Sequence, residues 1–292
     1  MKKSTRTIST FADYKKTSAE WITVLDTEFY PDFLDQAMVI YTPVIQRFIE
    51  LVAGTKTSED LLRIIAQEKL PIRTQLQRVF RKYVSPSTSV EMLKKVTTTE
   101  TIIKNFGDRF RSIEEICARL KERPVPDEAL VALLNEYKDR GQKGYDLTEA
   151  FFQWFESKFP KYEITGPVRA GRDVMLNQVL EGYPKKTPAD IFVKDRKGRP
   201  LLVGFARYDS DRGGAQEDDR TSGNRDKIAG ILEYNRVHDT RIKILYLNDG
   251  PGLMLGSMWN DYCDLETDGE GRTMVSTLKM LDTRFTEKWL LS

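Results

Sequence analysis

The pattern of hydrophobic and polar positions divides the chain into two parts. Over residues 11–159, apolar residues recur at spacings of three and four, the period of an amphipathic helix, and the clearest stripe covers residues 34–52. After Pro160 the pattern changes to short strand-like runs that are separated by turn residues. The sequence therefore predicts an N-terminal helical domain over residues 1–144 and a second domain over residues 145–292.

The second domain contains a helix, a strand, a hairpin, a helix, a strand and a further helix in that order. The hairpin is predicted from residues 189–193 and 201–205, which flank turn residues 195–200. A helix over residues 225–237 and a strand over residues 242–247 follow it. This alternation of helices and strands is typical of an α/β (α+β) fold.

Composition and charge exclude several classes of function. The 292 residues carry 46 Lys+Arg against 44 Asp+Glu, so a nucleic-acid partner would need local basic patches. Cys117, Cys263 and the single histidine, His238, form no cluster that could hold zinc or build a disulfide framework. No apolar run is long enough for a membrane span and no signal-peptide core follows the basic N-terminus, so we expect a cytoplasmic (bacterial) protein that does not bind membranes.

The most informative stretch of sequence is residues 184–227. Phosphate-loop, dinucleotide-binding, HExxH and GxSxG motifs do not occur in the chain. Within the stretch, Asp190 begins one strand of the predicted hairpin and Arg207 ends the other, which places a carboxylate and a cation at one edge of a sheet. This arrangement suits phosphodiester hydrolysis, in which a carboxylate-bound divalent ion activates water and a nearby cation assists.

The stretch resembles the PD-(D/E)xK nuclease core, and more particularly the type II restriction endonucleases. Pro188-Ala189-Asp190 stands in place of the PD element, and Phe205-Ala206-Arg207 in place of (D/E)xK. The sequence departs from the motif at both ends of the second triplet, because Phe205 cannot bind a metal and Arg207 replaces the lysine. Some members of the family carry an apolar or small residue at the acidic position and supply the second carboxylate from the following helix, where Glu217 and Asp218 lie here.

The resemblance implies both a fold and an activity. The fold is a restriction-endonuclease-like core over about residues 145–262, with a mixed central sheet flanked by helices. The activity is that of a type II site-specific deoxyribonuclease, which hydrolyses phosphodiester bonds in double-stranded DNA with Mg²⁺ as cofactor. Asp190 and one of Glu217 and Asp218 would hold the metal, Arg207 would contact the scissile phosphate, and Glu149 would face the metal site from the preceding helix.

A homodimer is expected, because the two strands of a pseudo-symmetric site are most simply cut by two copies of the enzyme. The helical domain over residues 1–144 would then serve DNA binding or dimerisation.

Each candidate also has a purely structural explanation. Asp190 could be a solvated aspartate at a turn, the acidic residues that open the next helix could interact with its dipole, and Glu149 fits a capping box. Asp209 and Asp211, just past the second strand of the hairpin, compete for the role of second metal ligand. Lys227 could replace the lysine missing from the motif or be an ordinary solvated helix residue.

Two groups of residues are expected to contact DNA. Arg212 and Gln216 can form bidentate contacts to the edges of guanine and adenine, so they would read the sequence. The basic residues on and around the hairpin would contact phosphates, which sets affinity and not specificity. These residues are Lys185, Lys186, Arg196, Lys197, Arg199, Arg220 and Arg225.

Two other functions agree with the same sequence. Loss of the motif residues at Phe205 and Arg207 could leave a non-catalytic DNA-binding protein or an inactive subunit of a heteromeric nuclease. Alternatively, the chain is a helical scaffold or signalling protein whose second domain does unrelated work, and this possibility predicts no salt-dependent affinity for DNA.

Overall fold

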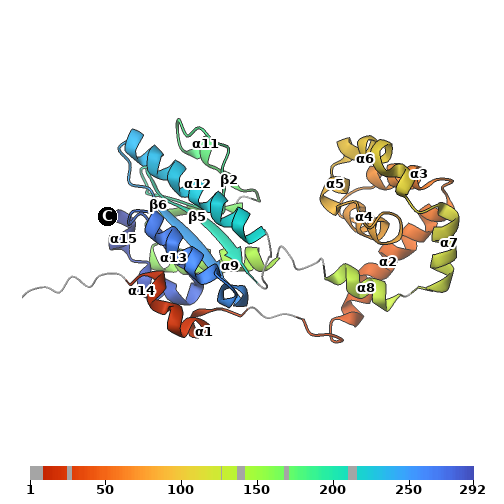
Figure 1. Ribbon diagram of the computed structural model, residues 1–292, viewed down its shortest axis with the longest axis horizontal. Helices are drawn as coiled ribbons and strands as arrows, with labels where there is room; N and C mark the ends of the chain where they lie inside the picture. Colours follow the sequence, from red (N-terminus) through yellow and green to blue (C-terminus); the bar gives the residue numbers. More distant parts are fainter. Residues whose placement is uncertain (1–8, 25–27, 126, 137–141, 168–170, 210–215) are drawn as a thin grey trace, which may run out of the picture. The chain divides into compact units, whose positions relative to one another are not determined.

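The computed structural model shows a mixed α/β fold, as the sequence predicts (Figure 1). Contacts divide the chain into two units, which we call the helical unit (Thr27–Arg140) and the α/β unit (Met1–Asp26 and Gly141–Ser292). Among the described residues, no helix is long and apolar enough to cross a membrane. The structure describes residues 9–24, 28–125, 127–136, 142–167, 171–209 and 216–292, and at residues 142–143 and 216–222 the backbone alone.

The helical unit packs its helices around a core of large apolar side chains. The stripe predicted over residues 34–52 is the buried face of its longest helix, where Tyr41, Ile45 and Phe48 are almost fully buried. Four helices begin after a residue whose side chain accepts a hydrogen bond from the backbone three residues on, namely Thr57, Ser89, Ser112 and Asp127. The helices are α2 (Leu34–Ala53), α3 (Ser58–Gln67), α4 (Ile72–Tyr83), α5 (Val90–Lys94), α6 (Thr99–Phe106), α7 (Ile113–Glu122) and α8 (Glu128–Asn135), with 3₁₀ turns η2 (Val96–Thr98) and η3 (Gly107–Arg109).

The N-terminal segment belongs to the α/β unit and not to the helical one. It forms the 3₁₀ turn η1 (Phe11–Thr17) and the short helix α1 (Ser18–Trp21). The fully buried Phe11 ring stacks on Trp259 with ring centroids 4.3 Å apart. The domain boundary predicted from the sequence, with residues 1–144 in one helical domain, is therefore corrected here. Helical periodicity shows that a segment is amphipathic but not which core it covers.

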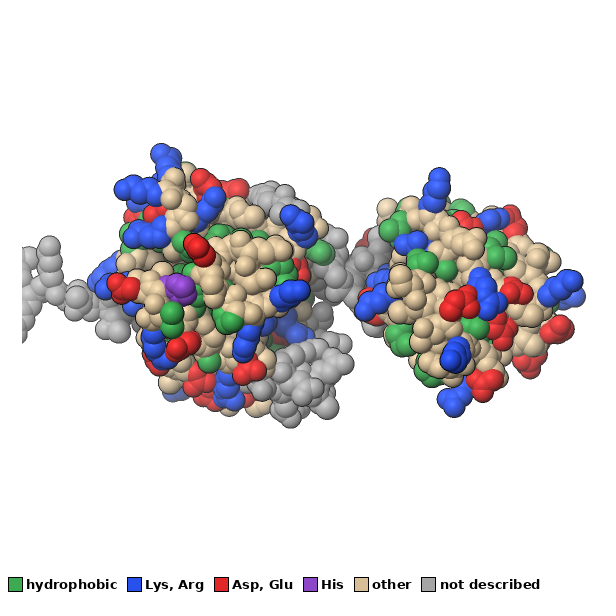
Figure 2. All heavy atoms as spheres, turned by 90° about the horizontal axis from the view of Figure 1, so that it is seen from above, with side chains coloured by type: hydrophobic (Ala, Val, Ile, Leu, Met, Phe, Trp, Pro, Cys, Tyr) green, Lys and Arg blue, Asp and Glu red, His purple; other side chains and the backbone are tan. Residues whose placement is uncertain are grey.

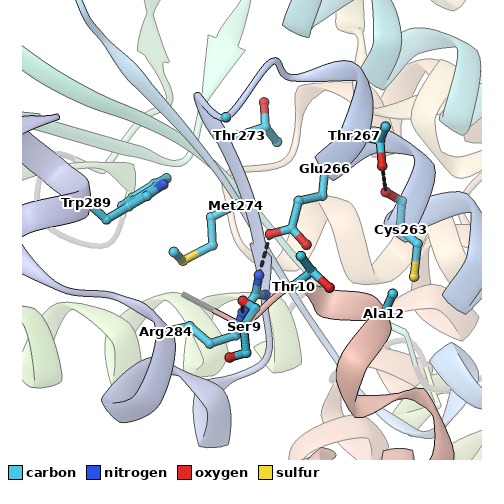
Figure 3. A pocket seen from close by; sticks show the side chains of 11 residues that line it. Ser9, Thr10, Ala12, Cys263, Glu266, Thr267, Thr273, Met274, Arg284 and Trp289 are labelled. Carbon is cyan, nitrogen blue, oxygen red and sulfur yellow. Dashed lines mark hydrogen bonds and ion pairs between the residues drawn. The ribbon is translucent and has the colours of Figure 1, made fainter. Parts of the chain in front are cut away.

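A buried ion pair anchors the same segment (Figure 3). The guanidinium of Arg284 pairs with Glu266 and donates through Nε to the carbonyl of Ser9 at 2.9 Å. Glu266 in turn accepts a hydrogen bond of 2.6 Å from the backbone N–H of Phe11. A cavity of about 310 Å³ lies beside this pair, and Ser9, Thr10 and Ala12 of the N-terminal segment form part of its lining. Two of its other lining residues, Glu266 and Arg284, are bonded to that segment.

The central sheet of the α/β unit is mixed, with strand order β1-β4-β5-β6-β7. The pairs β1·β4 and β4·β5 are antiparallel, and β5·β6 and β6·β7 are parallel. The predicted hairpin is confirmed as β4 and β5, and Gly198 takes the positive φ of 83° that its turn requires. The strands are β1 (Glu163–Thr165), β4 (Ile191–Lys194), β5 (Pro200–Tyr208), β6 (Lys243–Asp249) and β7 (Thr273–Ser276), and a separate pair is formed by β2 (Val174–Met175) and β3 (Pro188–Ala189).

Both faces of the sheet are covered, because successive strand residues point to opposite sides. On one face, Phe205 and Tyr246 pack with Ile231 of α12 (Gln216–Val237) and with α13 (Met258–Asp268). The other face packs on Phe151, Phe152 and Phe155 of α9 (Gln142–Lys158) and on the C-terminal helices. The remaining elements are α11 (Leu176–Val179), η4 (Pro251–Met254), η5 (Leu278–Met280), α14 (Leu281–Arg284) and α15 (Glu287–Leu291).

Candidate active site

Asp190 and Arg207 lie at the same edge of the sheet, as the predicted hairpin requires. Ile191 pairs with Gly204, so Asp190 stands opposite Phe205 in the second half of β5. Its Oδ2 accepts a hydrogen bond of 2.9 Å from the backbone N–H of Ala206. Both Asp190 and Arg207 line a cavity of about 310 Å³, together with Phe205, Ala206, Gly223, Asn224, Lys227, Tyr246, Asn248 and Tyr262. We call this cavity the β5 cavity.

Asp190 is half-buried, and its surroundings shift its ionisation. Burial raises the pKa of its carboxyl group above the ordinary value, and the neighbouring carboxylate of Asp173 raises it further. The hydrogen bond from Ala206 and the positive charge of Lys227 act in the opposite direction and lower this pKa. Asp190 is therefore not a solvated aspartate at a turn. Its carboxylate is partly desolvated and lies beside a second acid and a cation.

Asp173 also lines the site, although no pattern in the sequence predicts it. It directly precedes β2, and the pairing of Val174 with Ala189 places Asp173 opposite Asp190. The two aspartates line a smaller cavity of about 170 Å³, together with Gly144, Tyr145, Thr148, Pro167 and Ala206. The strands that bring them together have two residues each, which is too short for an alternating pattern to be recognised in the sequence.

Lys227 reaches the β5 cavity from α12. Its Nζ lies 4.4 Å from the centroid of the Phe205 ring, a cation–π distance, and its side chain is half-buried. Burial lowers the pKa of the Lys227 ammonium, while the negative charge of Asp190 raises it. Lys227 is therefore not an ordinary solvated helix residue, and it lines the same cavity as Arg207.

Arg207 is held by the residue that follows β5. Its Nε donates to Oδ1 of Asp209, which is 2 % exposed, and Oδ2 of Asp209 accepts a bond of 3.4 Å from Asn248. The Asp209 carboxylate is thus turned away from solvent and engaged by Arg207. This geometry does not suit the alternative in which Asp209 binds a metal.

The helix α9 contributes different residues from the one expected. Gly144, Tyr145 and Thr148 line the smaller cavity, whereas Glu149 lines neither cavity among the described residues. The carboxylate of Glu149 accepts a hydrogen bond of 3.1 Å from Gln153, one turn further along the helix. A role of Glu149 at the metal stays a prediction.

Several expected residues lie outside the described part of the chain. The backbones of Glu217 and Asp218 form the first turn of α12, as predicted for the helix after the hairpin, but their side chains are outside the described residues. The same holds for the side chains of Gln216 and Arg220, and Arg212 lies entirely outside the described residues. Their metal and DNA contacts stay predictions.

The basic residues expected to contact phosphates do not form one surface. Arg196, Lys197 and Arg199 lie in the β4–β5 turn, which begins five residues after Asp190 and so about 16 Å from it along the strand. They line a separate cavity of about 580 Å³ at that end of the hairpin, where Arg199 pairs with Asp195.

Lys185 and Lys186 are exposed just before β3, on the side of Asp190. Arg225 pairs with Asp268 at 3.0 Å and Asp264 at 3.8 Å, so acidic partners already engage it. On the face shown in Figure 2, Lys and Arg side chains are interspersed with Asp and Glu side chains.

Two carboxylates therefore converge beside two cations at the carboxyl end of β5. In the described part of the chain, no group of three or more His, Cys, Asp or Glu residues could hold a metal ion. Searches against protein-family models, curated proteins and solved structures found no match to this chain.

Proposed function

We propose that the protein is a Mg²⁺-dependent, sequence-specific endonuclease of double-stranded DNA, of the type II restriction class. The observation that carries the proposal is the convergence of Asp190, Asp173, Arg207 and Lys227 at one edge of the sheet. These residues come from four separate segments, and paired carboxylates beside cations suit the hydrolysis of a phosphodiester. The order of α9, β1, the hairpin, α12 and β6 is also the order that the hydrophobic pattern predicts.

The donor atoms fit a magnesium ion. Mg²⁺ prefers carboxylate oxygens, and it is usually held by one or two carboxylates together with water and substrate phosphates. Asp190 uses Oδ2 for the Ala206 N–H and retains Oδ1 as a ligand, and Asp173 offers the second carboxylate. Glu217 or Asp218 would complete the set as predicted. The ion supplies activation of the attacking water and offsets the charge of the phosphate.

The cations of the site act on the phosphate. Arg207 uses Nε for Asp209, so Nη1 and Nη2 remain to donate to two oxygens of the scissile phosphate. Lys227 adds a second positive charge, which Phe205 holds at the rim of the cavity through its ring. Phe205, which stands where the motif has an acidic residue, would therefore position the ammonium group of Lys227 and not a metal ion. Phe205 can do so because it is buried and stacked on Tyr246.

Incubation with plasmid and phage DNA in the presence and absence of Mg²⁺, followed by sequencing of the fragment ends, tests the proposal. We expect discrete, Mg²⁺-dependent fragments from the wild-type protein, and binding without cleavage from Asp190→Ala. Asp239→Asn is the matched control, because Asp239 is exposed at the other end of α12 and its positive φ of 48° is one that asparagine tolerates. Sedimentation of the free and DNA-bound protein tests the proposed homodimer.

A non-catalytic DNA-binding protein is the second candidate function. It is favoured by Phe205, which is buried where the motif has an acidic residue. This candidate predicts salt-dependent binding of DNA with no cleavage under any divalent-ion condition. Intact DNA together with filter-binding affinity would therefore replace the first proposal with the second.

A further inference from the structure

Asp209 is a buried acid at the polar edge of the sheet. It follows β5 directly, two residues after Arg207, and only 2 % of it is exposed. A carboxylate is costly to bury unless hydrogen bonds and an opposite charge compensate it. Both of its oxygens are engaged, Oδ1 by Nε of Arg207 and Oδ2 by Asn248.

The backbone of the next strand fixes the place of this carboxylate. The N–H of Asp209 donates to the carbonyl of Asp249 at 2.8 Å, and its own carbonyl accepts from Gly252 at 2.9 Å. Gly250, with a φ of 106°, lies so close that a Cβ atom there would overlap the backbone of Asp209. Asp209 is thus clamped by the turn after β6, independently of any substrate.

The bond from Arg207 to this fixed acid restricts the arginine in turn. The guanidinium is planar, so a bond at Nε determines the plane in which Nη1 and Nη2 lie. Arg207 lines the β5 cavity and keeps 37 % of its side chain exposed, which leaves these donors accessible. An arginine without such a partner would lose side-chain conformational entropy when the phosphate binds, and this loss would oppose binding.

We propose that Asp209 is a positioning residue, which acts through Arg207 and orients its free guanidinium donors toward the phosphate that binds in the β5 cavity. This inference rests on the proposed nuclease function. The competing explanation is a buried ion pair that only stabilises the fold. The two differ in one respect: a stabilising pair affects the folded fraction, whereas a positioning residue affects turnover only while Arg207 is present.

A double-mutant cycle with Asp209→Asn, Arg207→Gln and both together, on full-length protein with DNA and Mg²⁺, separates the two explanations. We expect Asp209→Asn to lower kcat by about 10–100-fold, the usual effect of an orienting partner, with a much smaller change in KM. In the Arg207→Gln background the same substitution should cause no further loss. Thermal melting gives the folded fraction, by which each rate is normalised.

Two further variants keep the test decisive. Asp209→Glu retains the buried charge but displaces it by one methylene, so we expect a similar loss of kcat should Asp209→Asn fail to fold. Asp249→Asn removes a neighbouring buried carboxylate that bonds Thr23, Gly250 and Leu278 and not Arg207, and its effect should be the same with and without Arg207.

The outcomes that overturn the inference are distinct from those that overturn the proposed function. Wild-type kcat in a folded Asp209 variant, or equal losses from Asp209→Asn in both backgrounds, would refute the positioning role while the nuclease function stands. Absence of any Mg²⁺-dependent cleavage by the wild-type protein would refute the nuclease function, and the role of Asp209 with it.

Discussion

Asp173 and Asp190 lie opposite each other across the short antiparallel pair β2·β3, and they line the same cavity at the edge of the central sheet. Two carboxylates so placed repel each other when both are ionised, and burial adds to the cost at Asp190. A divalent cation between them would relieve both penalties. The pair is therefore the most direct place to test for Mg²⁺.

The first prediction concerns the metal requirement. Asp190→Asn should abolish Mg²⁺-dependent cleavage, because it removes the carboxylate that the backbone of β5 fixes. Asp173→Asn should raise the Mg²⁺ concentration needed for half-maximal cleavage, since one of two ligands is removed. Titration of cleavage with Mg²⁺ measures both effects, and Asp239→Asn should titrate like the wild type. An unchanged Mg²⁺ dependence in Asp173→Asn would exclude that residue as a ligand.

The second prediction concerns stability and pH. A pKa raised in the folded state means that the ionised carboxylate of Asp190 destabilises the fold. This penalty is absent below the ordinary pKa of an aspartate and complete once the pH exceeds the raised value. Asp190→Asn should therefore raise the Tm at neutral pH without divalent ions, and the gain should vanish in acid.

The effect of Mg²⁺ on the Tm tests the same carboxylate. Mg²⁺ should raise the Tm of the wild-type protein by binding the folded state, and it should have little effect on Asp190→Asn. Differential scanning fluorimetry across pH, with and without Mg²⁺, measures both effects. Equal Mg²⁺ stabilisation of the two proteins would contradict a metal site at Asp190.

The third prediction concerns Lys227. Lys227→Met should lower cleavage by about 10–100-fold while DNA binding changes little, because the charge acts at the reacting phosphate. Burial lowers the pKa of this lysine, so activity that depends on its charge should decline at a lower pH than an ordinary lysine would give. Lys227→Arg should lose this alkaline decline, since arginine stays charged. Lys288→Met, at an exposed position on α15, serves as the control.

The fourth prediction separates the two groups of basic residues. Replacing Lys185 and Lys186 by Gln should weaken DNA binding and reduce the salt slope by about 0.9 for each phosphate that is no longer neutralised, because these lysines lie on the side of Asp190. The same replacement of Arg196 and Lys197 should leave both quantities unchanged, since they lie at the other end of the hairpin. Filter binding over a range of salt concentrations decides between them.

The fifth prediction concerns the N-terminal segment. Phe11→Ala should cost about 3–5 kcal/mol, which corresponds to a decrease of about 10 °C in the Tm of the α/β unit, because it removes a fully buried ring that stacks on Trp259. The transition of the helical unit should not move. Phe29→Ala is the matched control, since Phe29 is 75 % exposed. Calorimetry that found both transitions shifted together would contradict the division into units.

The positions of the site residues could be predicted from the sequence where the strands that carry them are long, and not where they are short. The hairpin was predictable because β5 is long and turn residues separate it from β4, and this fixed Asp190 and Arg207 at one edge. Asp173 was not predictable, since two-residue strands carry no period. The phosphate contacts expected of Arg196, Lys197 and Arg199 stay predictions, and these residues lie away from Asp190 because a strand extends the chain by about 3.3 Å per residue.

The N-terminal segment also determines how the polypeptide can be divided. Because the chain starts in the α/β unit, leaves it to build the helical unit and then returns, the helical unit is an insertion and not a preceding domain. A single proteolytic cut in either of the two connections between the units would not separate the fragments. The uncut connection would hold the units together covalently, and the packing of Phe11 on Trp259 would keep the N-terminal segment on the α/β unit. No contiguous fragment contains the complete α/β unit alone, since residues 141–292 by themselves would leave Trp259 and Arg284 without the segment that covers them.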